Sequence, residues 1–258
     1  MEQTIELDQV LTKKQSDNIK RWEQEEVLLL ARHFQRLNDG TKSSGSYYTR
    51  TNRFVMSDND LKCLNKLKDI TSIRIYMSLE KEDKTKFTFC PIIKITTTSR
   101  KHPYCFSLIP EFDKPRPLRM NNESVNGGGR LVPGIFKEMI LTNWNNVEDN
   151  LIDDLFVAKD EGTRSLMRVN FFDVSSDIVL HLFNGTFHNN VARFIMYPGI
   201  DMNKFQNRNM ISFTPVLGIV PKKKVQTEII SRHGFAEFGD EEIFIEYSTP
   251  CPPTCPNE

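Results

Sequence analysis

The chain contains Phe87-Thr-Phe-Cys-Pro-Ile-Ile-Lys-Ile95 and, 124 residues later, Ile211-Ser-Phe-Thr-Pro-Val-Leu-Gly-Ile219. In both segments every second residue is apolar, which is the pattern of a β-strand that buries one face. Pro91 and Pro215 take the same place in the two segments. Because proline removes a donor from the ladder of a strand, we expect both at an edge or a bulge. The shared face and the shared proline indicate that the chain contains one module twice.

Two further matches keep the same order along the chain. Residues 52–57, Asn-x-Phe-x-Met-Ser, return at 170–175 as Asn-x-Phe-x-Val-Ser, a shift of 118. Residues 74–77, Arg-Ile-Tyr-Met, return at 193–196 as Arg-Phe-Ile-Met, a shift of 119. The shift only grows along the chain, as expected for a duplication with loop insertions in the second copy.

Each copy is predicted to fold as helix, helix, strand and strand. In the first copy we expect an amphipathic helix over 16–38 around Trp22, a short helix capped by Ser57, and strands over 72–78 and 87–95. In the second copy we expect a helix from Phe136 to Leu155 around Trp144, a short helix capped by Ser175, strands over 192–197 and 210–219, and a last strand over 242–247. The predicted fold class is therefore α+β, a tandem duplication of a small helix–helix–strand–strand module.

The segment 121–134 is the predicted boundary between the copies. It holds Gly127-Gly-Gly129 in an Asn-rich context, which favours a flexible link. The 258 residues would then comprise a first αβ repeat over 1–120, a Gly/Asn-rich linker over 121–134, and a second αβ repeat over 135–258 with a Cys-Pro tail. Each repeat has the size of a small domain, since domains usually hold ~100–200 residues.

The chain carries no excess of charge. Lys and Arg together number 34, as do Asp and Glu, so no overall positive field would attract nucleic acid. No apolar run approaches the ~20 residues of a membrane span, and the acidic N-terminal residues do not resemble a secretory signal. We therefore expect a cytoplasmic protein without nucleic-acid partners or a membrane span, whose five cysteines are reduced thiols.

The sequence lacks the usual catalytic and phosphate-binding motifs, so we expect no catalytic residue, no metal and no cofactor. His102 stands three residues before Cys105, but a second half of such a metal site is missing. Residues of the second copy that would suit a hydrolytic or metal set are His181, His188, His233, Asp173, Asp177 and Glu241. Nothing in their spacing brings them together.

The end of the chain, Cys251-Pro-Pro-Thr-Cys255, invites three interpretations. It is an ordinary chain end, a binding segment stiffened by its prolines, or a metal or redox site. Two thiolates supply only half of a tetrahedral zinc site. The candidate interaction residues are Cys251, Pro252, Pro253 and Cys255, and we expect the two thiols to be dispensable for folding.

Arg74 and Arg193 occupy the same strand position in the alignment of the two copies, on the face opposite the apolar one. An arginine there could bind a carboxylate or phosphate, so both are candidate ligand-binding residues. The alternative is that the stem covers apolar surface while the guanidinium reaches water or an acidic neighbour. Trp22 and Trp144 lie on helix faces, and we expect them in the core.

The closing residues from Tyr247 to Cys255 form an aromatic residue followed by Pro-Cys-Pro and a final Cys. Together with Trp22, Arg74 and Tyr76 in the first copy, and Trp144 and Arg193 in the second, they resemble a group of small uncharacterised bacterial proteins. In that group a Trp-bearing helix precedes an Arg-x-Tyr strand and the chain ends in Pro-Cys-Pro-x-x-Cys. Residues 112–117 look like the same ending without cysteines. The resemblance implies two such units fused in one chain, and it implies no activity.

We therefore expect a non-catalytic structural or protein-interaction protein. Its partner would be another protein or a second copy of itself, bound through the amphipathic helices or the C-terminal tail. The alternative is a small-molecule binding or enzymatic module with a pocket between the two repeats.

Overall fold

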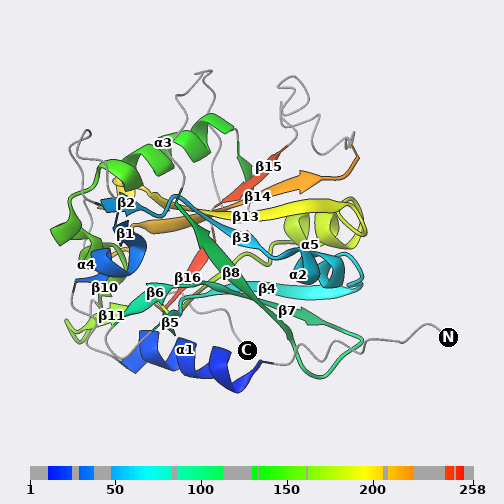
Figure 1. Ribbon diagram of the computed structural model, residues 1–258, viewed down its shortest axis with the longest axis horizontal. Helices are drawn as coiled ribbons and strands as arrows, with labels where there is room; N and C mark the ends of the chain where they lie inside the picture. Colours follow the sequence, from blue (N-terminus) through cyan, green and yellow to red (C-terminus); the bar gives the residue numbers. More distant parts are fainter. Residues whose placement is uncertain are drawn as a thin grey trace.

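A computed structural model describes residues 11–24, 29–37, 48–82, 86–112, 130–132, 134–160, 162–205, 209–223, 242–246 and 248–252. The fold is mixed α+β, as the sequence predicts, and a large curled antiparallel sheet dominates it (Figure 1). Within the described residues the strands of this sheet follow the order β16 (Thr249–Cys251), β12 (Phe171–Asp173), β4 (Ile70–Tyr76), β7 (Ile92–Thr97), β8 (Tyr104–Glu111), β3 (Arg53–Met56), β13 (Val191–Ile200), β14 (Phe213–Pro221), β15 (Ile243–Glu246) and β9 (Arg130–Val132).

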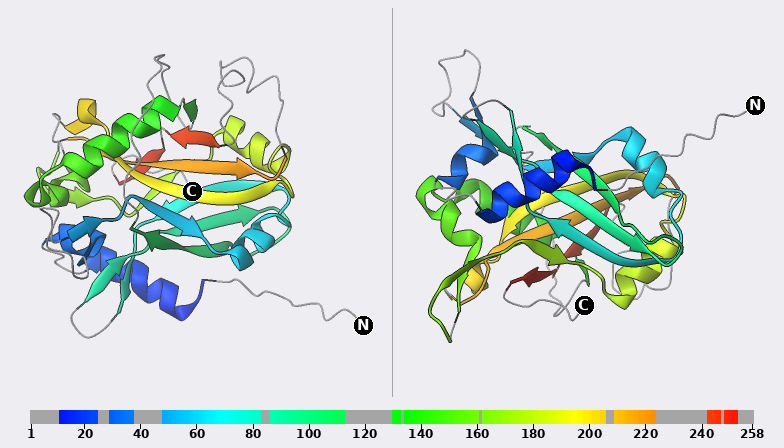
Figure 2. Two further views of the ribbon diagram at one scale, coloured as in Figure 1. Left: turned by 45° about the horizontal axis from the view of Figure 1, so that its top comes forward. Right: turned by 90° about the horizontal axis from the view of Figure 1, so that it is seen from below.

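The sheet curls around its core because its strands change partners along the chain. Residues 104–107 of β8 pair with β7, and residues 108–111 pair with β3. At the far side, β15 pairs with β14, while β16, which follows β15 after two residues, pairs with β12. β15, next to one end of the strand order, and β16, at the other end, are thus close in the sequence, and the sheet is strongly curled (Figure 2).

Short hairpins and helices surround the sheet. The hairpins are β1 (Gln35–Leu37) with β2 (Tyr48–Arg50), β5 (Leu79–Lys81) with β6 (Phe87–Phe89), and β10 (Val157–Lys159) with β11 (Leu166–Arg168). The helical elements are α1 (Lys13–Gln24), η1 (Leu30–Phe34), α2 (Asp58–Leu64), α3 (Gly134–Asn146), η2 (Asp149–Leu151), α4 (Ile152–Leu155), α5 (Asp177–Asn184) and α6 (Met202–Phe205). α1 and α3 lie on opposite sides of the molecule (Figures 1 and 2).

The short helices α2 and α5 each begin at a serine that follows a strand. Ser57 caps α2 by accepting a hydrogen bond from the backbone N–H of Asp60, as predicted. The cap of α5 is Ser176, so the prediction of Ser175 is wrong by one residue. The hydroxyl of Ser175 instead accepts a hydrogen bond from the backbone N–H of Ile73, which ties the start of α5 to β4.

The long helix predicted over 16–38 is wrong in its extent. α1 ends at Gln24, and Leu29, with a φ of 66°, precedes η1 and the extended β1. The spacing suggested a continuous helix because Leu30 and Phe34 stand four residues apart and are both buried, but they lie in a 3-10 turn. The helix predicted from Phe136 to Leu155 is divided in the same way into α3, η2 and α4.

Pro91 and Pro215 take different places relative to the strands. The strand predicted over 87–95 is interrupted at Cys90 and Pro91, which separate β6 from β7. Pro215 lies inside β14, but outside the stretch 217–219 that pairs with β15. At neither position does a neighbouring strand require a backbone N–H from the proline, as expected for a residue that has none.

An aromatic cluster fills the space inside the curled sheet. The ring centroids of Phe34 and Phe89 lie 4.4 Å apart, and those of Phe156 and Phe213 also lie 4.4 Å apart. The buried members of the cluster are Trp22, Phe34, Phe54, Phe89, Trp144, Phe156, Phe172 and Phe213. The prediction that both tryptophans are core residues is confirmed.

The two halves of the chain, residues 11–112 and 130–252, share this sheet and this core. β12 of the second half pairs with β4 of the first, and β3 of the first half lies between β8 and β13. Residues 130–132 of the predicted linker form β9 and Gly134 starts α3, so the linker does not extend to 134; residues 121–129 and 133 lie outside the described residues. No helix in the described part of the chain is long and apolar enough to cross a membrane.

Candidate functional site

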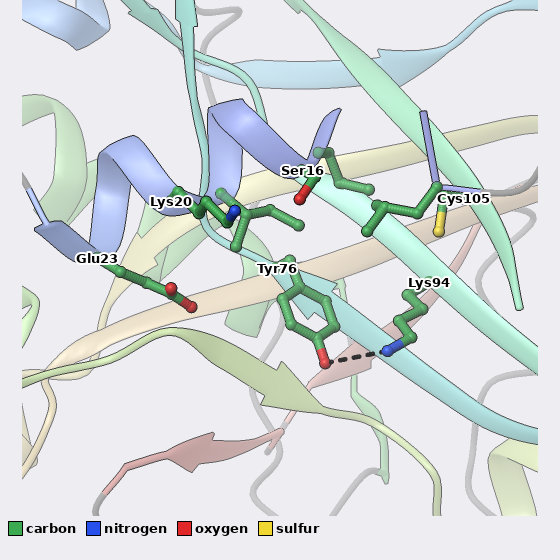
Figure 3. A pocket seen from close by; sticks show the side chains of 9 residues that line it. Ser16, Lys20, Glu23, Tyr76, Lys94 and Cys105 are labelled. Atoms are coloured by element: carbon green, nitrogen blue, oxygen red, sulfur yellow. Dashed lines mark hydrogen bonds between the residues drawn. The ribbon is translucent and has the colours of Figure 1, made fainter. Parts of the chain in front are cut away.

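A pocket of about 210 Å3 lies between α1 and the sheet (Figure 3). The sheet contributes Tyr76 from β4, Ile92 and Lys94 from β7, and Cys105 from β8. α1 covers them with Ser16, Ile19, Lys20 and Glu23. The pocket therefore joins residues from distant parts of the first half.

Strand alternation places these side chains on the face that points away from the aromatic core. Ile75 and Ile93 are fully buried in the core, so their neighbours Tyr76 and Lys94 emerge on the opposite face. The register sets Lys94 directly opposite Cys105, and Tyr76 directly opposite Ile92. The pocket floor is thus fixed by backbone pairing of three adjacent strands.

Lys94 and Tyr76 form the polar centre of the pocket. The Lys94 Nζ lies 3.5 Å from the Tyr76 hydroxyl oxygen and 5.1 Å from the centre of its ring, and the two side chains point toward one another (Figure 3). Tyr76 stacks on Phe171, with ring centroids 5.0 Å apart. No carboxylate of the described residues forms an ion pair with Lys94, whose ammonium has three donors to offer.

Polar contacts at both ends of α1 hold it above the pocket. The Gln15 side-chain amide donates to the Cys105 carbonyl at 3.3 Å and to the Ser107 hydroxyl at 3.1 Å. Lys14 forms an ion pair with Glu80 of β5. Near the other end, the Arg21 guanidinium donates to the Leu79 carbonyl at 3.3 Å. The helix is anchored beside the pocket.

The thiol of Cys105 is not a nucleophile at neutral pH. Burial raises its pKa to about 11, so the protonated form predominates. The site therefore presents a protonated thiol, a phenol, two ammonium groups and one carboxylate, between apolar walls formed by Leu11, Ile19 and Ile92. These groups suit the binding of a small anion with an apolar portion.

A second polar cluster lies in the second half, beneath α3. The Tyr197 hydroxyl donates to Glu242 Oε1 at 2.9 Å, and the Lys137 Nζ stands 4.7 Å from the Tyr197 ring centre and 5.1 Å from that of Phe244. Burial, reinforced by the neighbouring Glu242 carboxylate, raises the pKa of Tyr197. A Cβ on Gly218 would lie 2.1 Å from Glu242 Oε1, so the carboxylate fills the space above this glycine.

The two arginines predicted to bind a ligand are not brought together. Arg74 is engaged by Asp173, with Nε and Oδ2 2.9 Å apart and both side chains largely buried. Arg193 is exposed on β13, opposite Val220. Their surroundings differ, because Arg74 lies in the regular part of β4 whereas Arg193 borders a register shift in β13. Arg74 follows the alternative interpretation, in which the guanidinium meets an acidic neighbour.

Cys251, the first residue of the predicted tail segment, belongs to the sheet. Cys251 is buried in β16 and is disulfide-bonded, so the expectation of a reduced thiol is wrong at this position. Cys63, Cys90 and Cys105 are free thiols and none of them is its partner. Pro252 follows through a cis peptide bond, while Pro253 and Cys255 lie outside the described residues, as do Pro115 and Pro117 of the related segment.

Within the described residues, the histidines singled out in the sequence are not gathered into a metal site. His188 Nδ1 lies 3.0 Å from the Leu67 carbonyl, and His102 is exposed. Within the described residues no group of three or more His, Cys, Asp or Glu side chains is placed to hold a metal ion; His233 and Glu241 lie outside that part of the chain.

Sequence reasoning missed Tyr76 and Lys94 as a site. The available signal was their polarity beside isoleucines, with Tyr76 after Ile75 and Lys94 between Ile93 and Ile95. Their partner α1 could not be assigned to them without the fold. No family model, no curated protein and no solved structure matches this chain.

Proposed function

We propose that this protein is a non-catalytic binding protein, built by duplication of one αβ unit, and that the pocket under α1 is its binding site. The observation that carries the proposal is a contrast between the halves. The first half has a pocket of about 210 Å3 under α1, whereas side chains of the protein itself occupy the corresponding space under α3 in the second half.

The strand registers support the duplication. Ile75 of β4 lies opposite Phe172 of β12, just as Met196 of β13 lies opposite Phe54 of β3. β4 and β13 also each have a register shift at the start, between Ile70 and Ser72 in β4 and between Val191 and Arg193 in β13. A repeated irregularity of this kind is difficult to explain by independent origin, because bulges are specific features of a fold.

Reciprocal contacts of the two tryptophans also support it. The Trp22 indole donates to the Val169 carbonyl of the second half at 2.6 Å, and the Trp144 indole donates to the Thr51 carbonyl of the first half at 2.9 Å. An arginine guanidinium stands 5.6 Å from the ring centre in each case, Arg168 over Trp22 and Arg50 over Trp144. Each half thus provides a carbonyl acceptor and an arginine contact for the tryptophan of the other half.

These registers relate the pocket to the cluster under α3. Tyr76 lies opposite Ile92 as Tyr197 lies opposite Val216, so the two tyrosines correspond. In the same way Lys94 corresponds to Gly218, and Cys105 to Phe244. In the second half the Glu242 carboxylate and the Tyr197 ring lie above Gly218, and Phe244 packs edge-on against Tyr197, whereas in the first half the smaller Cys105 lines an open pocket.

The reactive groups of the described chain favour binding over catalysis. Burial raises the pKa of Cys90 to about 12 and that of Cys105 to about 11, which keeps both thiols protonated and weakly nucleophilic. His33 and His188 each place Nδ1 against a backbone carbonyl, at 2.9 and 3.0 Å. Such groups are positioned for structure rather than for proton transfer.

The proposed binding pocket lies apart from the junction of the two halves. The space where the halves meet is filled by the rings of Phe34, Trp144, Phe156 and Phe213. A ligand site between the repeats would have to displace this core, whereas the pocket under α1 requires no such change.

The test is thermal unfolding with a panel of small acids, amines, alcohols and amides. A ligand that binds the native state at 100 times its Kd stabilises it by about 2.7 kcal/mol. We expect at least one panel member to raise the melting temperature of the wild type but not of Cys105→Phe, which copies Phe244 and fills the pocket. Phe244→Leu in the second half is the matched control and should respond as the wild type does. Equal stabilisation of Cys105→Phe by every active compound would refute the assignment.

A further inference from the structure

We infer that the pocket under α1 binds the carboxylate of a short aliphatic acid, with Lys94 and Tyr76 as the groups that hold it. The inference rests on the proposed function and specifies the ligand class of the same site.

The protein's own second half provides the first argument. There the tyrosine hydroxyl donates to a carboxylate oxygen, from Tyr197 to Glu242 Oε1 at 2.9 Å, while the Lys137 ammonium lies against the same ring and forms its ion pair with Glu138. The first half keeps the tyrosine, as Tyr76, and supplies an ammonium, as Lys94, but has no carboxylate of the described residues paired with it. A ligand carboxylate would complete the arrangement that Glu242 completes in the second half.

The charges around the pocket provide the second argument. The lining contains two ammonium groups, from Lys20 and Lys94, and one carboxylate, from Glu23, so it has an excess of positive charge. The Cys105 thiol adds no negative charge, because burial keeps it protonated at neutral pH. A carboxylate beside Lys94 and Tyr76 would accept hydrogen bonds from an ammonium and a phenol, and charge-assisted bonds of this kind are stronger than neutral ones.

The size and the walls of the pocket define the rest of the ligand. A volume of about 210 Å3 is below the ~300–1,000 Å3 of sites for drug-sized molecules. The apolar side chains of Leu11, Ile19 and Ile92 would surround the remainder of the molecule. These features suit a short, straight aliphatic chain, since apolar surface is stabilised when it leaves water for apolar walls.

The experiment compares hexanoate with hexanamide by isothermal titration calorimetry. The two molecules have the same shape, but only hexanoate is charged. We expect the wild type to bind hexanoate about tenfold or more tightly than hexanamide, since one charge-assisted bond corresponds to at least one such factor. Lys94→Met should abolish this preference while hexanamide binds as before, and Tyr76→Phe should reduce it. Glu242→Gln in the second half is the matched control and should leave both affinities unchanged.

Three results would overturn the inference, and they differ in what they say of the proposed function. If hexanoate and hexanamide bind equally and Cys105→Phe abolishes both, the pocket is a binding site but not one for carboxylates. If Lys94→Met retains the full preference for hexanoate, another group holds the carboxylate. If neither compound binds the wild type, the carboxylate inference is wrong, and the proposed function is then judged by the panel of ligands alone. Far-UV circular dichroism of each variant establishes that it is folded.

Discussion

Replacing Trp22 with phenylalanine removes one of the two reciprocal links between the halves. The Trp22 indole N–H donates to the Val169 carbonyl at 2.6 Å, and both residues are fully buried. Phenylalanine keeps an aromatic ring in the cluster but has no donor. The Val169 carbonyl would lose this partner in a place that water does not reach.

The magnitude follows from the contacts that are lost. An unsatisfied buried carbonyl costs ~1–3 kcal/mol. The smaller ring also loses packing against Phe89 and Phe156, at a cost of ~1 kcal/mol, and weakens the contact with the Arg168 guanidinium, which contributes ~0.5–1 kcal/mol. We expect Trp22→Phe to lower the free energy of unfolding by about 2–5 kcal/mol. Trp144→Phe should cost the same within about 1 kcal/mol, because its contacts are alike.

Urea denaturation followed by far-UV circular dichroism measures both losses. Because the halves share one sheet, each variant should unfold in a single transition with an unchanged dependence on urea. A loss below ~0.5 kcal/mol in either variant would refute the reasoning for that residue, since surface substitutions reach that size. Two separate transitions in the wild type would refute the view that the halves unfold as one body.

Three further predictions concern the core, the thiols and the assembly state. Phe89→Ala and Phe213→Ala should each cost about 3–5 kcal/mol in a thermal or urea melt, because both rings are buried in the aromatic cluster; a melt equal to that of the wild type would show that the site collapses without penalty. Burial raises the pKa of Cys90 to about 12, so the protonated thiol stabilises the folded state fully below about pH 8.5, where unfolded thiols are also protonated. This contribution is lost as the pH rises toward 12, so Cys90→Ala should lose less stability than the wild type between about pH 9 and 11. Parallel pH profiles of the two proteins would contradict this. Mass measured by light scattering across concentration tests the expected self-assembly, for which a constant monomer mass would be the contrary result.

The parts of the fold that follow from local periodicity could be predicted from the sequence. Ile73 and Ile75 alternate with polar residues and are buried in β4, because a strand presents successive side chains to opposite faces. Ser57 caps α2 because its side chain and the helix start are neighbours in the chain. The α+β class and the buried tryptophans rest on the same kind of signal.

The parts that depend on distant contacts could not be predicted. The four-residue spacing of Leu30 and Phe34 favours an α-helix, yet both are buried in a 3-10 turn, where Phe34 packs against the distant Phe89 and Trp144. The pairing of β12 with β4 joins residues about 100 positions apart, which no local pattern encodes. The ion pair of Arg74 with Asp173 likewise joins two residues 99 positions apart, so the sequence pattern did not reveal it.

The candidate site was hidden for the same reason. Tyr76 and Lys94 are ordinary outward residues of two strands until α1 covers them. The pairing of Lys94 with Cys105, which sets the floor of the pocket, becomes visible only when the strand registers are known.

A crystal structure of the protein soaked with hexanoate tests the central claim most directly. The account predicts the ligand under α1, with its carboxylate oxygens at ~2.7–3.0 Å from the Lys94 Nζ and the Tyr76 hydroxyl, as in charge-assisted hydrogen bonds, and the cluster of Tyr197 and Glu242 unchanged. Hexanoate bound elsewhere while the pocket under α1 holds only water, or bound there with its carboxylate turned away from Lys94, would contradict it.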